Sequence, residues 1–200
     1  MTSIVEKVRN LITDNLKTDG RDVYTYEAST SSKIFTLTES NIEASTIVVY
    51  KNGTVWSSAN YSYSTTTGKL TVTGTLSAGD SLEVFYSYYA KYSNNELDGF
   101  VKGAIYYISV NGYKTFVVES GDILSPVPTE AEENLIAIIA HILIKGNIVS
   151  YRTPELTITF ERGDSIEKKI TKFIRQCGKA YGVLEYIDLR AVVAVEEEDL

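Results

Sequence analysis

The chain has 200 residues, 44 % of them hydrophobic and 22 % charged, and a formal net charge of −7. These values are ordinary for a globular protein made of one domain, or of one domain with a small satellite. The acidic balance argues against a surface that grips nucleic acid, and the single cysteine, Cys177, excludes an internal disulfide and a cysteine-ligated zinc site.

The first predicted element is an amphipathic helix that begins near Ser3. Ser3 and Glu6 have the spacing of a capping box. The apolar residues of this segment fall on one helical stripe: Ile4, Val5, Val8, Leu11 and Ile12. Asp19-Gly20 is expected to end the helix, and the stretch up to Ser32 is expected to be a linker. An amphipathic segment that carries acids is unlike a signal peptide, so we expect no targeting function for it.

Residues 33–90 are predicted to form a β-module. Short strands are expected near residues 34–37, 47–50, 61–63, 70–73 and 82–88. The strongest hairpin signal is Asn52-Gly53, because both residues tolerate the positive φ angles of a type I′ turn. In the last strand, Leu82, Val84 and Tyr86 alternate with Ser81, Glu83 and Phe85. Strands of this length and spacing indicate a small sandwich or barrel.

Three more helices are predicted after the module. Their capping residues are Ser93 with Glu96, Thr129 with Glu132, and Asp164-Ser165 with Glu167. The third helix is apolar nearly all round, so it should be buried on most sides. Its apolar run, residues 135–144, is about half the length of a membrane span, and we expect no membrane contact. A further strand is expected within residues 155–160.

Together these elements predict an α+β fold. We expect a helical bundle of about four helices with an inserted small antiparallel β-sandwich or barrel module and an extended C-terminal arm. The predicted domains are a helical core of residues 1–32 and 91–188, the inserted module of residues 33–90, and the arm of residues 189–200. A helical core with a module inserted into one loop suits an assembly component, because each part offers a face to a different partner.

No residue pattern predicts catalysis, and the chain is expected not to be an enzyme. His141 is the only histidine, so sites that need several histidines are excluded, and we expect it to be a satisfied core or interface residue. Cys177 lies on the apolar stripe of the fourth helix and is expected to be an inert core residue. The clustered acids Glu130, Glu132 and Glu133 fall in the first turn of a helix, where its dipole favours them. We therefore expect no catalytic, metal-binding or cofactor-binding residues and no cofactor.

The aromatic residues leave two interpretations open. The 15 tyrosines suit protein interfaces and half-buried strands equally well. Trp56 and Tyr61 could form a platform on which a sugar stacks, but aromatic residues in strands more often belong to the core.

One passage resembles a known family. It comprises residues 89–100, Tyr-Ala-Lys-Tyr-Ser-Asn-Asn-Glu-Leu-Asp-Gly-Phe, and continues into Ala-Ile-Tyr-Tyr at 104–107. With the short N-terminal helix, the amphipathic helices and the C-terminal arm, it resembles the head-to-tail connector (adaptor) proteins of tailed bacteriophages. The residues around 48–53 and 78–80 also resemble β-repeats of phage fibre and tail proteins. Simpler adaptors lack such an insert.

The resemblance implies a structural protein of the virion neck, assembled in the host cytoplasm. It would form a homo-oligomeric, dodecameric ring between the portal and the tail or stopper. DNA would pass through the ring without sequence-specific contact, and an acidic lumen would repel its phosphates. The alternative is a carbohydrate- or receptor-binding component of a tail fibre or another surface assembly.

Two sets of contact residues follow from these expectations. The arm has strand-forming residues but no sequence-adjacent strand to pair with, so it is expected to add itself to a sheet edge, most simply on the portal; a frayed, solvated tail is the alternative. The expected portal contacts are Leu189, Arg190, Ala191, Val192, Val193, Ala194, Val195, Glu196, Glu197 and Glu198. The expected contacts between subunits are Ile138, Ile142, Tyr106 and Tyr107, because the apolar third helix exceeds what three short neighbours would cover.

Overall fold

The computed structural model describes residues 2–27, 33–111, 114–120, 122–152, 157–177 and 193–196. The chain divides into two compact units. Met1–Thr13 and Asn94–Leu200 form the first, which we call the helical unit, and Asp14–Ser93 form the second, which we call the β unit. The four α-helices of the described residues all belong to the helical unit: α1 (Thr2–Ile12), α2 (Asn94–Val110), α3 (Glu130–Ile144) and α4 (Ile166–Cys177).

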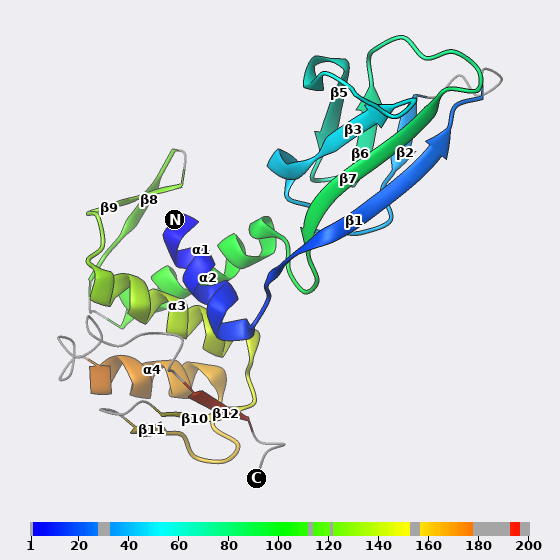
Figure 1. Cartoon of the computed structure of the whole chain (residues 1–200). Helices are drawn as coiled ribbons and strands as arrows, with labels where there is room; N and C mark the ends of the chain where they lie inside the picture. Colours follow the sequence, from blue (N-terminus) through cyan, green and yellow to red (C-terminus); the bar gives the residue numbers. More distant parts are fainter. Residues whose placement is uncertain are drawn as a thin grey trace. The chain divides into compact units, whose positions relative to one another are not determined.

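Helix α3 is the centre of the helical unit, because α1, α2 and α4 all pack against it (Figure 1). Its buried residues lie on every side of the helix, as its nearly continuous apolar sequence predicts. Helix α1 contributes one stripe to the same core, formed by Ile4, Val5, Val8 and Ile12. The helices therefore share one apolar core that a single copy of the chain builds for itself.

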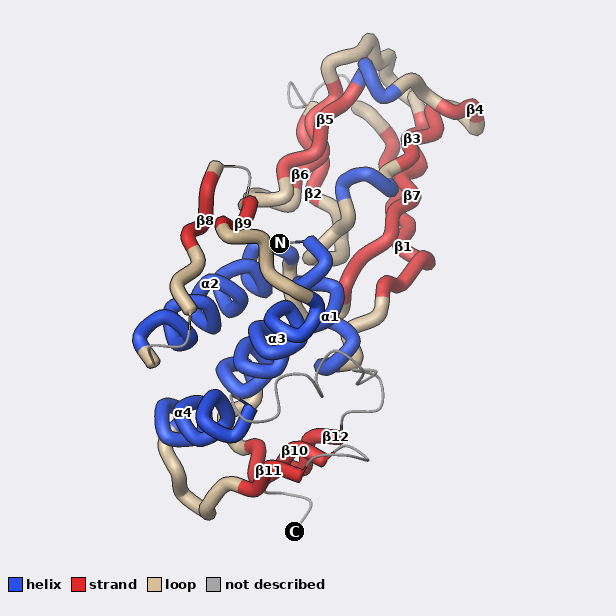
Figure 2. The backbone as a smooth tube through the Cα atoms, turned by 90° about the vertical axis from the view of Figure 1, so that its left-hand side faces the viewer, coloured by secondary structure: helices blue, strands red, loops and turns tan. Residues whose placement is uncertain are grey.

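The helical unit also contains two small antiparallel sheets (Figure 2). The strands of the first come between α2 and α3 in the sequence, and those of the second come after α3. A two-stranded ribbon consists of β8 (Val117–Glu119) and β9 (Ile123–Ser125). A three-stranded sheet has the order β11-β10-β12, with β10 (Ile148–Arg152) between β11 (Thr157–Thr159) and β12 (Val193–Glu196). All but the last residue of β10 are buried, so this strand belongs to the core.

The β unit contains two antiparallel sheets around one apolar core. The first has the order β1-β7-β3-β4, with β1 (Leu16–Thr25), β7 (Ser81–Tyr89), β3 (Val48–Lys51) and β4 (Thr54–Val55). The second has the order β2-β6-β5, with β2 (Ile34–Thr36), β6 (Lys69–Val72) and β5 (Tyr61–Ser64). The most completely buried core residues are Val49, Leu70, Leu82 and Val84. Short 3-10 turns at Ala44–Thr46 and Ser58–Asn60 complete the unit.

The two ends of the β unit are held together, as insertion between α1 and α2 requires. The Asp14 carboxylate accepts hydrogen bonds from the backbone N–H groups of Lys91 and Tyr92, at 3.1 and 3.2 Å. Leu16, at the start of β1, pairs with Tyr89, at the end of β7. The compact unit extends from Asp14 to Ser93, whereas the predicted module comprised residues 33–90.

The predicted fold class was wrong in its architecture. Instead of a helical bundle that carries one β-sandwich or barrel, the structure has several small antiparallel sheets distributed over both units, and the described residues form no closed barrel. The strands of the helical unit are three to five residues long. Strand β11 confirms the strand expected within residues 155–160. The ribbon and β10 were missed, because segments this short carry too few alternations for a local pattern to reveal them.

The linker predicted after the first helix was also wrong. Helix α1 ends at Ile12, and Thr13 has a φ of 52°. The Asp19-Gly20 pair, which indicates a turn locally, lies instead inside β1, beside a register shift between Lys17 and Gly20. Gly20 pairs with Tyr86 of β7, and a Cβ at Gly20 would overlap the Tyr86 ring. Position 20 therefore requires glycine because of Tyr86, which is distant in the sequence, and not because a helix ends there.

Candidate functional site

The described part of the C-terminal arm pairs within its own chain. Strand β12 lies antiparallel to β10, with Val193 opposite Arg152, Ala194 opposite Tyr151 and Val195 opposite Ser150. Residues 193–196 of the arm do add a strand to a sheet, but the sheet belongs to the same chain. The portal was expected as the host because no partner strand was recognised in this chain, and that reason does not apply to residues 193–196. Of the other expected portal contacts, residues 189–192, 197 and 198 lie outside the described residues. Contact with a portal stays a prediction.

The four expected subunit contacts differ in exposure. Ile138 and Ile142 are buried within the helical unit, so a neighbouring copy is not needed to cover them. Tyr106 is 65 % exposed on α2, and the half-buried Tyr107 packs its ring edge-on against it at 5.9 Å. Only the two tyrosines of this set offer side-chain surface to another molecule.

The exposed apolar surface of the helical unit extends beyond these tyrosines. It includes the last turns of α2, the β8–β9 ribbon that follows α2 and stands out from the helices (Figures 1 and 2), and the loop before α3. Its members are between 56 % and 80 % exposed: Tyr106, Val110, Val117, Ile123 and Val127. We call this set the α2–ribbon surface. Sequence reasoning missed the ribbon, because two apolar residues in each of two three-residue strands give no clear period.

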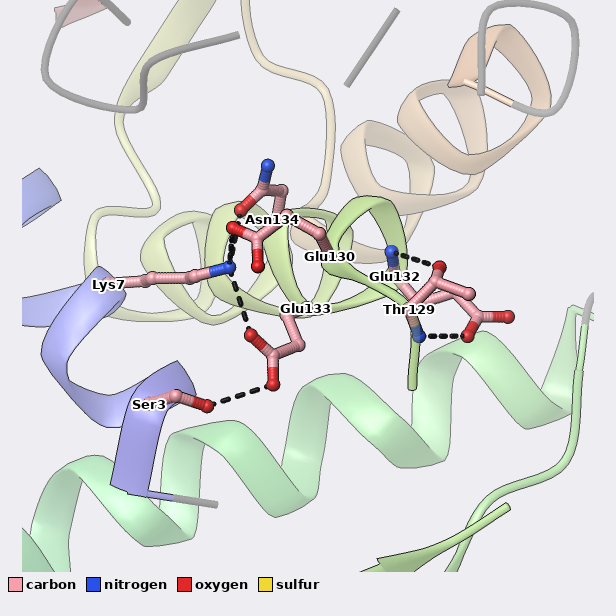
Figure 3. Close-up of polar contacts among 7 residues, drawn as sticks. All are labelled: Ser3, Lys7, Thr129, Glu130, Glu132, Glu133 and Asn134. Atoms are coloured by element: carbon pink, nitrogen blue, oxygen red, sulfur yellow. Dashed lines mark hydrogen bonds and ion pairs between the residues drawn. The ribbon is translucent and has the colours of Figure 1, made fainter. Parts of the chain in front are cut away.

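A polar cluster fixes α1 to the first turn of α3 (Figure 3). The Lys7 ammonium forms ion pairs with Glu130 and with Glu133, the latter at 3.0 Å, and donates a hydrogen bond to Asn134 Oδ1 at 2.9 Å. Ser3 Oγ donates to the other oxygen of Glu133 at 2.8 Å. Ser3 is therefore not the cap of α1, which begins at Thr2. The cluster explains the acids at this helix end as a docking contact.

Glu132 has a different role from its neighbours. Its side chain accepts a hydrogen bond from the Thr129 N–H at 2.7 Å, and Thr129 Oγ1 accepts one from the Glu132 N–H at 3.3 Å. The predicted capping box is thereby confirmed. Glu132 is buried and also pairs with Lys114, in the segment that leads to β8. This contact ties the base of the ribbon to α3.

His141 is a satisfied core histidine, as expected. It is buried, and its Nδ1 lies 3.0 Å from the hydroxyl of Tyr151 on β10. The Tyr151 ring packs edge-on against Phe160 and Phe173, so the pair belongs to the core between α3, α4 and the three-stranded sheet. The side chain of Cys177 lies outside the described residues.

Besides Asp14 at its end, the β unit buries the carboxylate of Asp22. It accepts hydrogen bonds from the Tyr86 hydroxyl at 2.7 Å, and from the Thr38 N–H and hydroxyl at 2.9 and 2.5 Å. Burial, and next the hydrogen bond to Asp22, raise the pKa of Tyr86. Since these donors come from β7 and from the segment after β2, Asp22 joins three parts of the unit.

Trp56 and Tyr61 do not form the exposed platform that was considered for them. Both pack against the apolar core of the β unit, and the Tyr61 hydroxyl donates to the carbonyl of Ile47 at 3.3 Å. The core interpretation is therefore correct for this pair. The exposed aromatic side chain of the β unit is Phe85, which lies on the outer face of the β1-β7-β3-β4 sheet beside the half-buried Tyr50.

On that outer face, Tyr50 and Phe85 form an edge-to-face pair with ring centres 5.4 Å apart. They line a hollow of about 320 Å³ together with Gly53 and Glu83. Arg21 Nη2 lies 3.0 Å from Glu83 Oε2, and its guanidinium lies 5.6 Å from the centre of the Phe85 ring. The alternation in β7 predicted that Glu83 and Phe85 share a face, but not which strands flank them.

Comparisons with known proteins leave the function open. No protein-family model matches the chain, and no curated protein matches it. Within the described ranges, no three His, Cys, Asp or Glu side chains are grouped so that they would hold a metal ion. Over the same residues, every helix is too short or too polar to cross a membrane.

Proposed function

We propose that this chain is a non-enzymatic head-to-tail adaptor of a tailed bacteriophage. In this proposal it forms a ring between the portal and the tail or stopper and surrounds the DNA conduit. The observation that carries the proposal is the α2–ribbon surface, because it gives the helical unit an exposed apolar face in addition to its own closed core.

The occupant that we propose for this face is a second copy of the chain. A two-stranded ribbon is marginally stable in water by itself, and a sheet edge with exposed apolar residues favours pairing with another chain. Val117 and Ile123 lie on the paired strands β8 and β9 and are 57 % and 56 % exposed. If the next subunit covers these two residues with a different part of its surface, the contact is heterologous. Heterologous contacts close into a ring when the rotation between neighbouring subunits permits it.

The charge of the chain supports a position around DNA. A formal net charge of −7 gives the protein no overall attraction for phosphate, so DNA would slide past it rather than bind. The resemblance of residues 89–107 to phage adaptors adds the portal and the tail or stopper as the neighbours, and twelve as the number of copies.

The inserted β unit supports a second contact for each subunit. It has its own core, and hydrogen bonds from Lys91 and Tyr92 to Asp14 hold its two ends together. It is therefore a separate unit inserted between α1 and α2 in the sequence. In a ring, each copy would present this unit to a molecule other than its neighbour, as an adaptor between unlike assemblies requires.

The test is the mass of the assembly, measured by native mass spectrometry of the full chain alone and with the portal protein of the same phage. We expect a ring on the portal. A double variant, Val117→Asp with Ile123→Asp, should abolish the ring, because it buries two carboxylates without partners. The matched control is Ile34→Asp on β2, where the native side chain is 50 % exposed and belongs to the β unit.

Two outcomes contradict the proposal at different levels. If the full chain never associates with a portal, the adaptor function is wrong. If rings form equally well with the double variant, the function survives but the α2–ribbon surface is not the contact between copies.

A further inference from the structure

The outer face of the β1-β7-β3-β4 sheet gathers residues of a kind that bind ligands. Side chains on a strand alternate between faces, and Leu82 and Val84 point into the core. Glu83 and Phe85 therefore point outwards. Directly across from them lie Tyr50 and Val48 on β3, and Val23 and Arg21 on β1. The register thus places two aromatic rings and an ion pair on one exposed patch.

The hollow on this face has a shape suited to a small ligand. It is lined by Tyr50, Gly53, Glu83 and Phe85, and its volume of about 320 Å³ lies at the lower end of the range for ligand pockets. The rings of Tyr50 and Phe85 meet edge to face, so they form two walls of a corner. Gly53 has no side chain, and no other atom lies within 4 Å of the position that a Cβ would occupy there. The hollow therefore stays open on the side of the hairpin turn.

The polar groups beside the hollow are balanced in charge. Arg21 and Glu83 form one ion pair, and their side chains are 56 % and 31 % exposed. The contact uses one of the five N–H donors of the guanidinium and one of the two carboxylate oxygens. The pair consequently offers further donors and acceptors side by side. Since the charges cancel, neither an anion nor a cation is favoured over a neutral ligand.

We infer that this hollow is a binding site for a neutral saccharide. A sugar ring has an apolar face of C–H groups, which suits the aromatic corner, and adjacent hydroxyls, which suit a carboxylate and a guanidinium held side by side. In the site, one pyranose ring packs against Phe85 and Tyr50 while its hydroxyls donate to Glu83 and accept from Arg21. This activity is additional to the proposed ring and does not depend on it, because all of the residues belong to the β unit.

The site also explains an exposed apolar patch that the fold does not need. Phe85 is 37 % exposed, and Val48, which lies opposite it on β3, is 38 % exposed. Val55 lies opposite Tyr50 on β4 and is 60 % exposed. Aromatic side chains lose little entropy when a ligand is bound, because few of their bonds rotate. A sugar would cover this patch without the extensive area that a protein partner requires.

The experiment is saturation-transfer NMR of the full chain with glucose, galactose, mannose, N-acetylglucosamine and their short neutral oligomers. We expect at least one of these sugars to bind with a dissociation constant of about 1 mM, as a single shallow subsite would give. Phe85→Ala should weaken binding by at least about tenfold, because it removes the ring that packs on the sugar. Glu83→Gln, which keeps an oxygen acceptor but breaks the ion pair, should weaken it less.

Ile34→Ala is the matched control, since it removes an exposed apolar side chain from the other sheet of the β unit and should leave sugar binding unchanged. The fluorescence of Trp56 shows whether the β unit of each variant is folded. Backbone chemical shifts of the unmutated chain locate the site independently of any variant, and they should change in β3, β7 and the hairpin turn. Absence of binding by every sugar at about 10 mM, or shifts confined to other elements, would overturn the inference.

Discussion

The hydrogen bond between Tyr86 and Asp22 is the contact whose loss the structure allows us to evaluate most directly. Replacing Tyr86 by Phe removes one hydroxyl and leaves the ring, so the packing against Gly20 is retained. Asp22 then keeps only its two bonds to Thr38. Both partners are buried, with 3 % of Tyr86 and 8 % of Asp22 exposed, so water does not replace the lost donor.

The expected cost is that of a hydrogen bond to a charged, buried acceptor. Such bonds contribute about 1.5–3 kcal/mol, and we take about 2 kcal/mol for Tyr86→Phe. For a unit the size of Asp14–Ser93, this corresponds to a fall in Tm of about 8–16 °C. Tyr24→Phe is the control: its hydroxyl donates to the carbonyl of Thr36 at a partly exposed position, and losing it should cost about 0.5–1 kcal/mol.

The chain contains its own probes for the two units. Trp56 is the only tryptophan and packs against the core of the β unit. All described α-helices belong to the helical unit, so helical circular dichroism reports on that unit. Thermal unfolding followed by both signals should show the Trp56 transition of Tyr86→Phe moving down while the helical transition stays in place.

Two results would refute this reasoning. Equal effects of Tyr86→Phe and Tyr24→Phe would mean that the bond to Asp22 is not special. A parallel shift of both transitions would mean that the two units unfold as one, and that the β unit is not an independent insert.

Three further changes test the contacts that hold each unit together. Gly20→Ala should destabilise the β unit by about 1–3 kcal/mol, because the new methyl group overlaps the Tyr86 ring; Trp56 fluorescence in urea measures it, and an unchanged midpoint would contradict the overlap. Lys7→Met keeps the aliphatic stem but loses the contacts to α3, and should lower helical stability by about 1–3 kcal/mol in thermal circular dichroism. Hydrogen bonds from Ser77, Lys51 and Asn52 lower the pKa of Asp80 from 3.8 to about 2, so its contribution is full above pH 3.8 and is lost as the pH falls through about 2. Asp80→Asn should remove this part of the acid dependence of Trp56 unfolding, and an identical acid profile would refute the assignment.

Local signals predicted the parts of the fold that local chemistry determines. The Thr129–Glu132 capping box satisfies its own helix end, and the Asn52-Gly53 turn has φ angles of 50° and 76°, which these two residues tolerate. The alternation of β7 correctly separated Leu82 and Val84 from Glu83 and Phe85. Each of these features is set by residues within a few positions of one another.

The features that sequence reasoning missed depend on residues far apart in the chain. Strand β1 exists because it pairs with β7 about sixty positions later. Lys7 is placed by acids more than a hundred residues away. The same holds for the proposed sugar site, in which three strands bring Arg21, Tyr50 and Phe85 together. No spacing within one segment contains this information.

Helix α3 shows why burial predicted from sequence does not identify a subunit interface. Its nearly continuous apolar pattern correctly implied that it is covered on most sides, but the pattern carries no information about which chain covers it. In the structure, α1, α2, α4 and β10 of the same chain pack against α3, and Ile138 and Ile142 are buried inside the helical unit. Surface for another copy must therefore be sought where apolar residues remain exposed after the chain has folded. That criterion selects Tyr106, Val110 and the β8–β9 ribbon, and it moves the proposed ring contact from the centre of the helical unit to its projecting edge.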